Sequence, residues 1–311
     1  MTSATIAKNN AVLAPGGALH AARPSFVGIV GGELLKLRRQ WSTWLLALVV
    51  AGSLSLQYLV FFLLSNTKAR FGGIPDEFRY IVVGVDATML KVFGGALLIV
   101  VTARLIGMEY SSGTIRVVLA RGVGRLQLLL GKLTAVTLVA LALSGAGVAY
   151  SFLLKLIVLA VKFGSLDILT KAPSTFWQDS WVLYLTILIS FGTAILLAAA
   201  VAVVGRSLAF GLTVGIVWFP AENFATLFLF LASSLTGSNF WAVATGDLLG
   251  PNLNVMGHLV LPDRAAYVGA VGLTPPVVPV TGGHTLLVTA VWAAIFLAVA
   301  IILTWRRDVK E

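Results

Sequence analysis

Six long apolar stretches dominate this chain and restrict its fold more than any other feature of the sequence. A helix crosses a bilayer core with about 20 apolar residues, and each stretch reaches that length. Lipid offers the backbone no hydrogen-bond partners, so only helices or closed barrels can cross it, and the alternation typical of barrel strands is absent. We therefore predict an all-α integral membrane protein with six transmembrane helices. The expected spans are about 42–65, 81–106, 126–161, 181–204, 208–235 and 285–305.

The composition supports a membrane protein and excludes several kinds of site. Hydrophobic residues make up 59% of the chain and charged residues only 11%, which leaves too little polar surface for a water-soluble globule. Because the chain has no cysteine, disulfides, thiolate metal sites and a cysteine nucleophile are excluded. The three histidines do not share a helix at metal-ligand spacing, so we expect no metal, no cofactor and no catalytic residue. We expect a disordered cytoplasmic tail over 1–25 and one six-span domain over 26–311.

The basic residues are concentrated on one side of the predicted spans. With both termini inside, the inner segments carry the whole formal net charge of +10, and the charges elsewhere cancel. This positive-inside pattern predicts a multi-pass protein of the cell (inner) membrane, with both termini and the 107–125 segment cytoplasmic. Segments 66–79 and 236–284 should then lie outside. A sequence pI of about 10.2 does not indicate nucleic acid here, because the bases flank spans and can contact anionic membrane lipids.

A short segment before the first span, FVGIVGGELLKLRRQW over 26–41, has a helical pattern of its own. Its apolar residues recur at three- and four-residue steps and mark one face, whereas its charged residues are expected to point away. This pattern predicts an amphipathic helix in the inner membrane interface; the alternative is a frayed cytosolic extension of the first span. The apolar face comprises Val27, Val30, Leu34, Leu37 and Trp41, and the residues expected to point away are Glu33, Lys36, Arg39 and Gln40.

The link between the second and third spans, EYSSGTIRVVLARGVGRLQLLLGKL, is longer than a hairpin requires. Gly113 should break the helix of the second span, and Thr114 or a serine before it can cap a short helix over 115–121. Gly122 and Gly124 should end that helix. The link therefore predicts a short, basic, amphipathic helix held outside the membrane.

This short helix needs an anchor and a surface for its apolar side. Glu109, at the end of the second span, is expected to anchor it through Arg116 or Arg125, or through free backbone N–H groups at its start. The apolar side either packs beneath the chain's own spans or docks in a cleft of a cytoplasmic partner. That side is formed by Ile115, Val118 and Leu119.

The same link resembles the segment between the second and third spans of type-two ATP-binding-cassette (ABC) exporter permeases. In both, an acid, a Gly-Thr pair, a basic position, apolar residues and a closing Arg and Leu-Leu-Gly-Lys occur in that order. A proline common before the closing arginine is replaced here by Gly122-Val123-Gly124. The stretch GELLKLRRQWSTWLL is likewise similar to the interfacial helix and first span of those permeases. The matching positions in the link are Glu109, Gly113, Thr114, Arg116, Arg125, Gly131 and Lys132.

The resemblance implies the permease subunit of an exporter, with the short helix as a coupling helix resting in an ATPase subunit. It also implies a separate cytoplasmic cassette ATPase that binds ATP and Mg, and a second permease copy, identical or related. The chain lacks a phosphate-binding loop of its own, since GRLQLLLGKL has leucine at both 126 and 133, where glycine and a hydroxyl are required. We therefore expect no enzymatic activity in this chain. The residues expected to couple to the ATPase are Glu109, Gly113, Thr114, Ile115, Arg116, Leu119, Arg121 and Arg125.

The fifth apolar stretch contains WFPAENF, which places Glu222 near its middle. A carboxylate at that depth is costly, so it should face a cavity, have a partner or be protonated. Pro220 should kink the helix and widen the space beside it, and Lys91 lies at a comparable depth in the second stretch. Since the second and fifth spans line the translocation path of the resembled family, we assign Glu222, Asn223 and Lys91 to that path. The alternative is a helix broken at Pro220, with Glu222 in a watery outer vestibule.

The segment between the fifth and sixth spans is expected to be partly helical. Residues 236–284 are rich in glycine and proline yet hold large apolar residues, so we expect short or re-entrant helices that form an outer lid.

Two other function classes compete with an exporter permease. A secondary transporter would favour internal repeats and several ionisable groups at the midplane, and a membrane-embedded enzyme would need facing acids and histidines. ATP hydrolysis that appears only with a cassette ATPase separates these classes. The cargo is not specified by the sequence.

Overall fold

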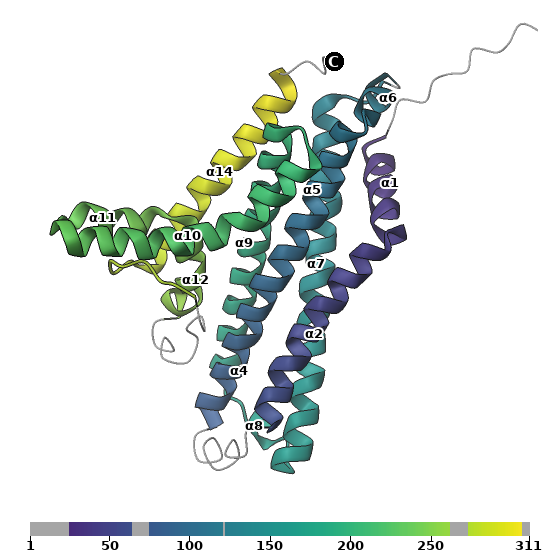
Figure 1. Ribbon diagram of the computed structural model, residues 1–311. Helices are drawn as coiled ribbons and strands as arrows, with labels where there is room; N and C mark the ends of the chain where they lie inside the picture. The colour runs from purple at the N-terminus through teal and green to yellow at the C-terminus, as the bar shows by residue number, and fades with distance from the viewer. Residues whose placement is uncertain (1–24, 64–74, 121, 262–272, 307–311) are drawn as a thin grey trace, which may run out of the picture.

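The computed structural model describes residues 25–63, 75–120, 122–261 and 273–306, which form helices joined by turns and short loops (Figure 1). The predicted tail, except for Ser25, lies outside the described residues, as do Arg121 and parts of the predicted segments 66–79 and 236–284. The helices are α1 Phe26–Arg39, α2 Trp41–Leu63, α4 Pro75–Met89, η1 Leu90–Gly94, α5 Gly95–Ser111, α6 Thr114–Ala120, α7 Arg125–Val158, η2 Leu159–Phe163, α8 Asp167–Thr170, α9 Ser174–Gly205, α10 Leu208–Thr236, α11 Asn239–Ala244, η3 Thr245–Asp247, α12 Leu249–Val260 and α14 Gly282–Arg306.

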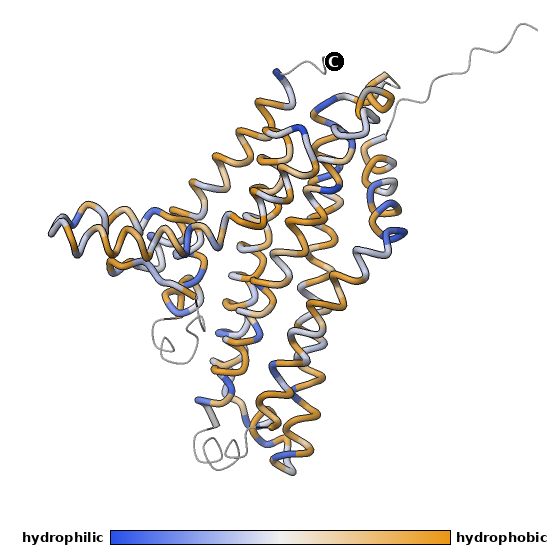
Figure 2. Tube along the Cα trace, in the orientation of Figure 1, coloured by the Kyte–Doolittle hydropathy of each residue, from blue (hydrophilic) through white to orange (hydrophobic). Residues whose placement is uncertain are grey.

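Six of these helices, or unbroken runs of them, are long and apolar enough to cross a membrane, which confirms the predicted fold class. Figure 2 shows hydrophobic residues along their length and hydrophilic residues concentrated in α1 and near the ends of the bundle. The second and fourth spans begin earlier than predicted, because helical hydrogen bonding continues through polar turns that precede the apolar part. The six are Trp41–Leu63, Glu77–Ser111, Arg125–Phe163, Ser174–Gly205, Leu208–Thr236 and Gly282–Arg306.

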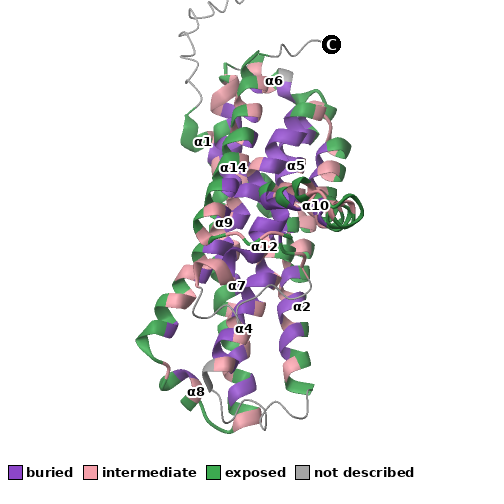
Figure 3. Ribbon diagram, turned by 90° about the vertical axis from the view of Figure 1, so that its left-hand side faces the viewer, coloured by how far each residue is buried: buried purple, intermediate pink, exposed green. Residues whose placement is uncertain are grey.

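The core of the bundle is built around α9, which packs against α5, α7, α10 and α14. It is the most buried of the six spans, and Figure 3 shows buried residues concentrated on the inner helices. Small residues let neighbouring helices approach closely: a Cβ added to Gly211 of α10 would lie 3.1 Å from the Ala202 Cβ of α9. A Cβ added to Gly215 would lie 2.7 Å from Cγ2 of Ile99 in α5. The first half of α10 is therefore held tightly against α5 and α9.

The helix α10 changes direction along its length. Its N-cap residue Ser207 accepts a hydrogen bond from the Phe210 N–H at 3.2 Å, and the helix continues through Pro220 without a break. It first runs beside α5 and α9 and then turns away, so that its second half and α11 project to one side of the bundle (Figure 1). A proline removes a backbone donor and crowds the preceding turn, which permits such a bend. The alternative of a helix broken at Pro220 does not describe this structure.

The segment between α10 and α14 folds back onto the bundle. It contains α11, η3 and α12, and α12 packs against α9, α10 and α14. The Asn252 side-chain amide donates to the carbonyls of Gly246 at 2.6 Å and Leu248 at 2.7 Å, and Nε2 of His284 also lies 2.9 Å from the Gly246 carbonyl. The expected short helices are thus present among the described residues of 236–284. Their placement at the outer face of the membrane stays a prediction.

The helix α1 is separate from the first span and packs against α7. Gln40, between α1 and α2, has extended backbone with φ −83° and ψ 112°. The predicted apolar face is wrong in part: Glu33 is buried with Val30 and Leu37, whereas Val27 is 79% exposed. Glu33 turns inward because it has a buried cationic partner on α7, which the periodicity of apolar residues alone cannot show. Trp41 is also exposed and belongs to α2.

Candidate functional site

The short helix α6 lies at one end of the bundle, next to the end of α5 (Figure 1). Gly113 before it and Gly122 after it have positive φ values of 67° and 83°, a conformation that side chains with a Cβ disfavour. Thr114 is the first residue of α6, and its hydroxyl lies 2.9 Å from that of Ser112. The two glycines therefore isolate a rod of one to two turns between two long spans.

The apolar side of α6 is divided between the bundle and the surroundings. Ile115 is buried, and Val118 and Leu119 are partly buried, so this part of the helix packs beneath the chain's own spans. Val117 is 54% exposed and leaves an apolar group for contact with another surface. The structure thus agrees with the alternative in which the predicted apolar side packs beneath the chain's own spans, and docking against a partner stays a prediction. The Arg116 side chain and Arg121 lie outside the described part of the chain.

Four charged residues next to α6 form a compact group, called here the four-charge cluster: Glu33 and Lys36 of α1, Glu109 of α5 and Lys132 of α7. Nζ of Lys132 lies 3.1 Å from Oε1 of Glu33 and 2.8 Å from Oε1 of Glu109. Nζ of Lys36 lies 2.9 Å and 3.1 Å from the same two oxygens. Lys132 also donates to the Leu105 carbonyl at 2.9 Å. The cluster therefore ties together three helices that are far apart in sequence.

The cluster is largely removed from water, although its two lysines differ. The Lys132 and Glu33 side chains are each 4% exposed and that of Glu109 is 11% exposed, whereas that of Lys36 is 51% exposed. Burial lowers the pKa of Lys36, but hydrogen bonds and charges from Glu33 and Glu109 outweigh that effect, so its pKa lies above the ordinary value. Breaking a buried ion pair by removing one partner is strongly destabilising. The cluster is therefore a stiff connection between α1, α5 and α7.

The structure gives Glu109 two lysine partners that the sequence analysis did not foresee. We expected Arg116, Arg125 or free N–H groups, all close in sequence, whereas Lys36 lies 73 residues away. Lys132 was part of the resembled motif but was interpreted only as a topology signal. The available clue was charge alone: Glu109 and Lys132 lie at or just inside the ends of apolar stretches, where a charge needs a partner, and Glu33 precedes the first stretch.

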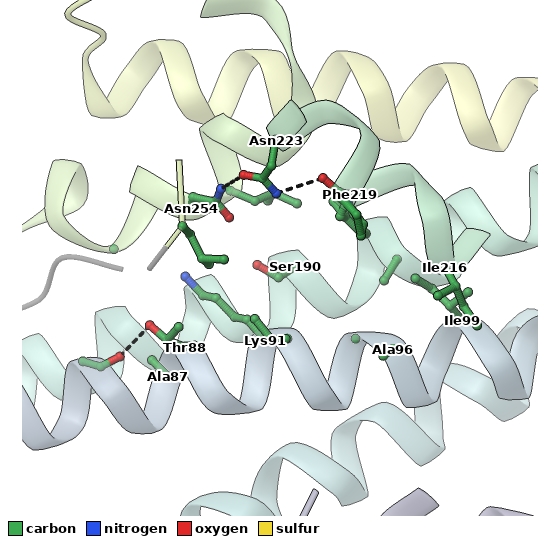
Figure 4. A pocket seen from close by; sticks show the side chains of 18 of the residues that line it. Ala87, Thr88, Lys91, Ala96, Ile99, Ser190, Ile216, Phe219, Asn223 and Asn254 are labelled. Atoms are coloured by element: carbon green, nitrogen blue, oxygen red, sulfur yellow. Dashed lines mark hydrogen bonds between the residues drawn. The ribbon is translucent and has the colours of Figure 1, made fainter. Parts of the chain in front are cut away.

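A cavity of about 310 Å³ lies between the second span, α9, α10 and α12 (Figure 4). Lys91 from η1 points into it, and Ser190 of α9, Asn223 of α10 and Asn254 of α12 also line it. The Asn254 amide nitrogen donates to Oδ1 of Asn223 at 3.1 Å, which joins α12 to α10. Two of the predicted path residues, Lys91 and Asn223, are therefore brought together on one cavity.

Lys91 emerges from a π-helical turn, Leu90–Gly94, inside an otherwise α-helical span. This turn is packed closely: a Cβ added to Gly94 would lie 2.5 Å from the Phe191 ring of α9. On its other side, a Cβ added to Gly147 of α7 would lie 2.5 Å from Cδ2 of Leu90. Single π turns within α-helices are frequent at functional sites, where they redirect a side chain. No feature of the apolar sequence pattern predicts this turn.

Glu222, the third predicted path residue, does not line this cavity. It is buried, and its carboxylate accepts hydrogen bonds from the N–H groups of Leu249, at 3.3 Å, and Gly250. These are the first two residues of α12, whose free N–H groups and helix dipole favour a negative charge. A Cβ added to Gly250 would lie 2.8 Å from Oε2 of Glu222, so the glycine permits the contact. Glu222 thus fastens α12 to α10.

A second buried ion pair lies within the spans and was also missed. Nζ of Lys155 in α7 is 3.6 Å from Oδ2 of Asp86 in α4. Asp86 also accepts hydrogen bonds from Gln57 at 2.7 Å and from Tyr58 at 2.9 Å, both in α2. Asp86 and Lys155 line a smaller cavity of about 110 Å³. The signal was present, since Asp86 lies in the predicted second span and Lys155 in the predicted third, but these two charges were used only to assign sidedness.

In the described ranges, no group of three or more His, Asp or Glu residues could hold a metal ion.

Comparison with known protein families identifies the family of this chain. The family model described as "ABC-2 family transporter protein" matches residues 29–221, from α1 through the first part of α10. This range includes α6, the four-charge cluster and Lys91, and it ends just before Glu222. No curated protein matches the chain. The match covers more than half of the sequence, and together with the six apolar spans it shows that this chain belongs to the ABC-2 transporter family.

Proposed function

We propose that the chain is the transmembrane permease subunit of an ABC exporter, which forms a translocation path and is driven by a separate cassette ATPase. The observation that carries the proposal is the isolated helix α6 beside a buried charge cluster, in a chain that belongs to the ABC-2 family. The absence of the phosphate-loop glycine and hydroxyl from the similar GRLQLLLGKL stretch supports a partner that binds ATP and Mg.

In this proposal α6 is the coupling helix. Movement of an ATPase against the exposed side of α6 passes to Glu109 at the end of α5, and the cluster carries it to α1 and α7 at once. A ligand shifts a conformational equilibrium only through its different affinity for the two states. ATP therefore acts on the cassettes, and the stiff contacts beside α6 transmit the difference. The proposed coupling residues are Glu109, Gly113, Thr114, Ile115, Arg116, Leu119, Arg121 and Arg125, and we include Glu33, Lys36 and Lys132 because they pair with Glu109 or with each other.

The proposal places α6 and both termini in the cytoplasm and pairs the chain with a second permease copy. The concentration of positive charge near α6 supports this orientation. The cysteine-free chain allows single cysteines to report it. Ala120→Cys and Trp305→Cys should resist an impermeant thiol reagent in intact cells, whereas Leu166→Cys, at the other end of the bundle, should react. Labelling at 120 and 305 with protection at 166 would overturn the orientation.

Contact between α6 and an ATPase is the decisive test. Val117→Cys places a single thiol on the exposed side of α6, and Leu166→Cys is the matched control because Leu166 is also exposed, by 40%. With a co-expressed cassette ATPase, a thiol-directed crosslinker should join the ATPase to position 117 and not to position 166. ATP hydrolysis by that ATPase should rise when the permease is present. No crosslink at 117 and no change in hydrolysis would contradict the proposal.

One observation favours a second candidate, a secondary transporter. Lys91, Asp86 and Lys155 place ionisable groups well inside the spans, as transporters driven by an ion gradient do. Transport in proteoliposomes distinguishes the two. Uptake that follows an imposed proton gradient with no ATPase present supports the secondary transporter, and uptake that requires ATP and the ATPase supports the permease.

A further inference from the structure

Lys91 is placed where its charge cannot reach the membrane surface. It lies about 20 Å along the helix from Glu77 and about 30 Å from Ser111, at 1.5 Å per residue. A lysine near the end of a span can extend its ammonium to the interface, but one at this depth cannot. Figure 4 shows the side chain pointing into the cavity, towards Ser190 and Asn254. The charge is therefore directed at the cavity interior.

Lys91 differs from Lys132 and Lys155, the buried lysines of the third span, because no described residue provides it with a counter-ion. Lys132 and Lys155 each pair with a carboxylate, at 2.8 Å and 3.6 Å. Over the described ranges of the chain, no hydrogen bond or ion pair joins the Lys91 ammonium to another residue. A charged side chain deep in a span is costly unless something compensates for it. The cavity supplies the space for a compensating group.

The polar side chains around Lys91 already make hydrogen bonds within the protein, and among the described residues that line the cavity the ammonium is the only charged donor. The hydroxyls of Ser190 and Thr88 each donate to a carbonyl in their own helix. The amide nitrogens of Asn223 and Asn254 do the same or join each other. The bonds are Ser190 to Thr186 at 2.9 Å, Thr88 to Gly84 at 3.0 Å, Asn223 to Phe219 at 2.8 Å and Asn254 to Asn223 at 3.1 Å.

The charge of the cavity selects the sign of its ligand. None of the described residues that line it is acidic. Asp86, five residues before Lys91, lines the smaller cavity instead and is held by Lys155, Gln57 and Tyr58. A cation in the larger cavity would meet only the repulsion of Lys91, whereas an anion would gain a charge-assisted hydrogen bond.

The walls of the cavity select the rest of the ligand. Ile99, Ile216, Phe219 and Leu253 contribute apolar surface from three helices, α5, α10 and α12. A volume of about 310 Å³ is at the lower end of the range for small-molecule sites. A compact molecule with an apolar body and one anionic group matches both the size and the chemistry.

We propose that this cavity binds an amphiphilic monoanion, with the Lys91 ammonium as its counter-charge and the apolar walls around its body. The inference rests on the proposed function, because it names the class of cargo that enters the path. The anionic group can belong to a free amphiphile or to a membrane lipid, and the recognition chemistry is the same for both.

Direct binding of three probes of equal chain length tests the sign of the charge. The purified full-length chain in phosphatidylcholine nanodiscs is titrated with laurate, dodecanol and dodecylamine. We expect laurate to bind about ten- to a hundredfold more tightly than dodecanol, since the difference is one hydrogen bond to a charged group. Equal binding of laurate and dodecanol, or preferential binding of dodecylamine, would overturn the proposal.

Variants assign the preference to Lys91. Lys91→Met keeps the length of the side chain and should remove the preference for laurate, whereas Lys91→Arg should retain most of it. Lys171→Met is the matched control, because Lys171 follows the end of α8, its side chain is 72% exposed and it does not line the cavity. If Lys91→Met is misfolded by size-exclusion chromatography, Lys91→Gln takes its place. A preference for laurate that survives Lys91→Met, or Lys91→Gln where that variant replaces it, would overturn the assignment.

Two further comparisons complete the test. The first distinguishes a membrane lipid from a free amphiphile as the source of the anion, and the second distinguishes this inference from the proposed function. Phosphatidylglycerol added to the nanodiscs should compete with laurate if lipid headgroups enter the cavity, and should leave its affinity unchanged if only free amphiphiles do. Both results support a site for amphiphilic anions. The binding measurements need no ATPase, so selective binding without ATP-driven transport would contradict only the proposed function. ATP-driven transport with no preference for anions would contradict only this inference.

Discussion

The four-charge cluster and the cavity around Lys91 both place lysine in apolar surroundings, but they treat its charge in opposite ways. Lys132 meets two carboxylates and a carbonyl, all within 3.1 Å. Lys91 meets a space of about 310 Å³. A buried charge that is satisfied by the protein fixes geometry, whereas one left to a cavity is available to a ligand. The difference assigns a mechanical role to the cluster and a binding role to the cavity.

The largest effect on stability is expected from Lys132→Met. It leaves the two largely buried carboxylates of Glu33 and Glu109 close together, with only the half-exposed Lys36 between them. Removing one partner of a buried pair costs about 3–5 kcal/mol, to be measured by unfolding in detergent. Lys36→Met is the matched control and should cost about 0–1 kcal/mol, as for an exposed pair. Equal losses for the two lysines would show that burial does not decide their contribution.

A somewhat smaller loss, about 3 kcal/mol, is expected from Asp86→Asn. The substitution keeps the shape and one accepting oxygen for the donors of Gln57 and Tyr58, but it leaves Lys155 without its counter-ion. The same unfolding assay measures it. The double variant Asp86→Asn with Lys155→Met should recover part of the loss, since no uncompensated charge is left. A double variant less stable than the single one would indicate that the ion pair is not the source of the effect.

Gly113→Val tests whether the cluster acts together with α6. Gly113 has open space around it, so the cost comes from the positive φ alone and is about 1–2 kcal/mol. We expect the fold to persist while ATP hydrolysis is uncoupled from transport, because the turn that orients α6 against α5 is altered. Gly145→Val is the control, since Gly145 also has open space but lies within α7. Transport per ATP that stays the same in both variants would remove α6 from the coupling path.

Much of the fold follows from hydropathy and glycine placement, and those parts could be predicted from the sequence. The six spans are long enough that apolar content alone identifies them, and Gly113 and Gly122 mark α6 because a positive φ favours glycine. The direction of α10 after Pro220 and the packing of α12 depend on contacts between distant segments. Such contacts leave no local pattern in the sequence.

The site was harder to predict than the fold for the same physical reason. Lys91 and Asn223 were assigned to one path because the second and fifth spans line the path of the resembled family, and the two residues do line one cavity. The partners of Glu109 and Glu33 were missed, because an ion pair between helices needs the rotation of each helix about its axis. Periodicity gives that rotation only when the buried face is apolar, and Glu33 lies on a buried face that is not.

A small, local effect is expected from Glu222→Gln. The substitution keeps the shape but removes the negative charge at the N-terminus of α12, where such a charge contributes about 0.3–1 kcal/mol. Hydrogen exchange at the N–H groups of Leu249 and Gly250 should accelerate, with little change elsewhere. Asp167→Asn is the control, because the Asp167 side chain is exposed at the start of α8, and it should leave α12 unchanged. If hydrogen exchange in α12 is unchanged and laurate binding is altered, Glu222 acts in the cavity and does not cap α12.

The smallest effect on stability is expected from Lys91→Met, and this prediction separates the two regions most sharply. No carboxylate among the described residues pairs with Lys91, so the substitution leaves no buried charge behind, unlike Lys132→Met. It also removes a costly cation from apolar surroundings, so the free energy of unfolding should stay the same or rise. The measurement is the unfolding assay used for Lys132→Met, with both variants in the same detergent. A loss as large as that of Lys132→Met would mean that the protein itself satisfies the Lys91 charge, and the cavity would then have no free cation to offer a ligand.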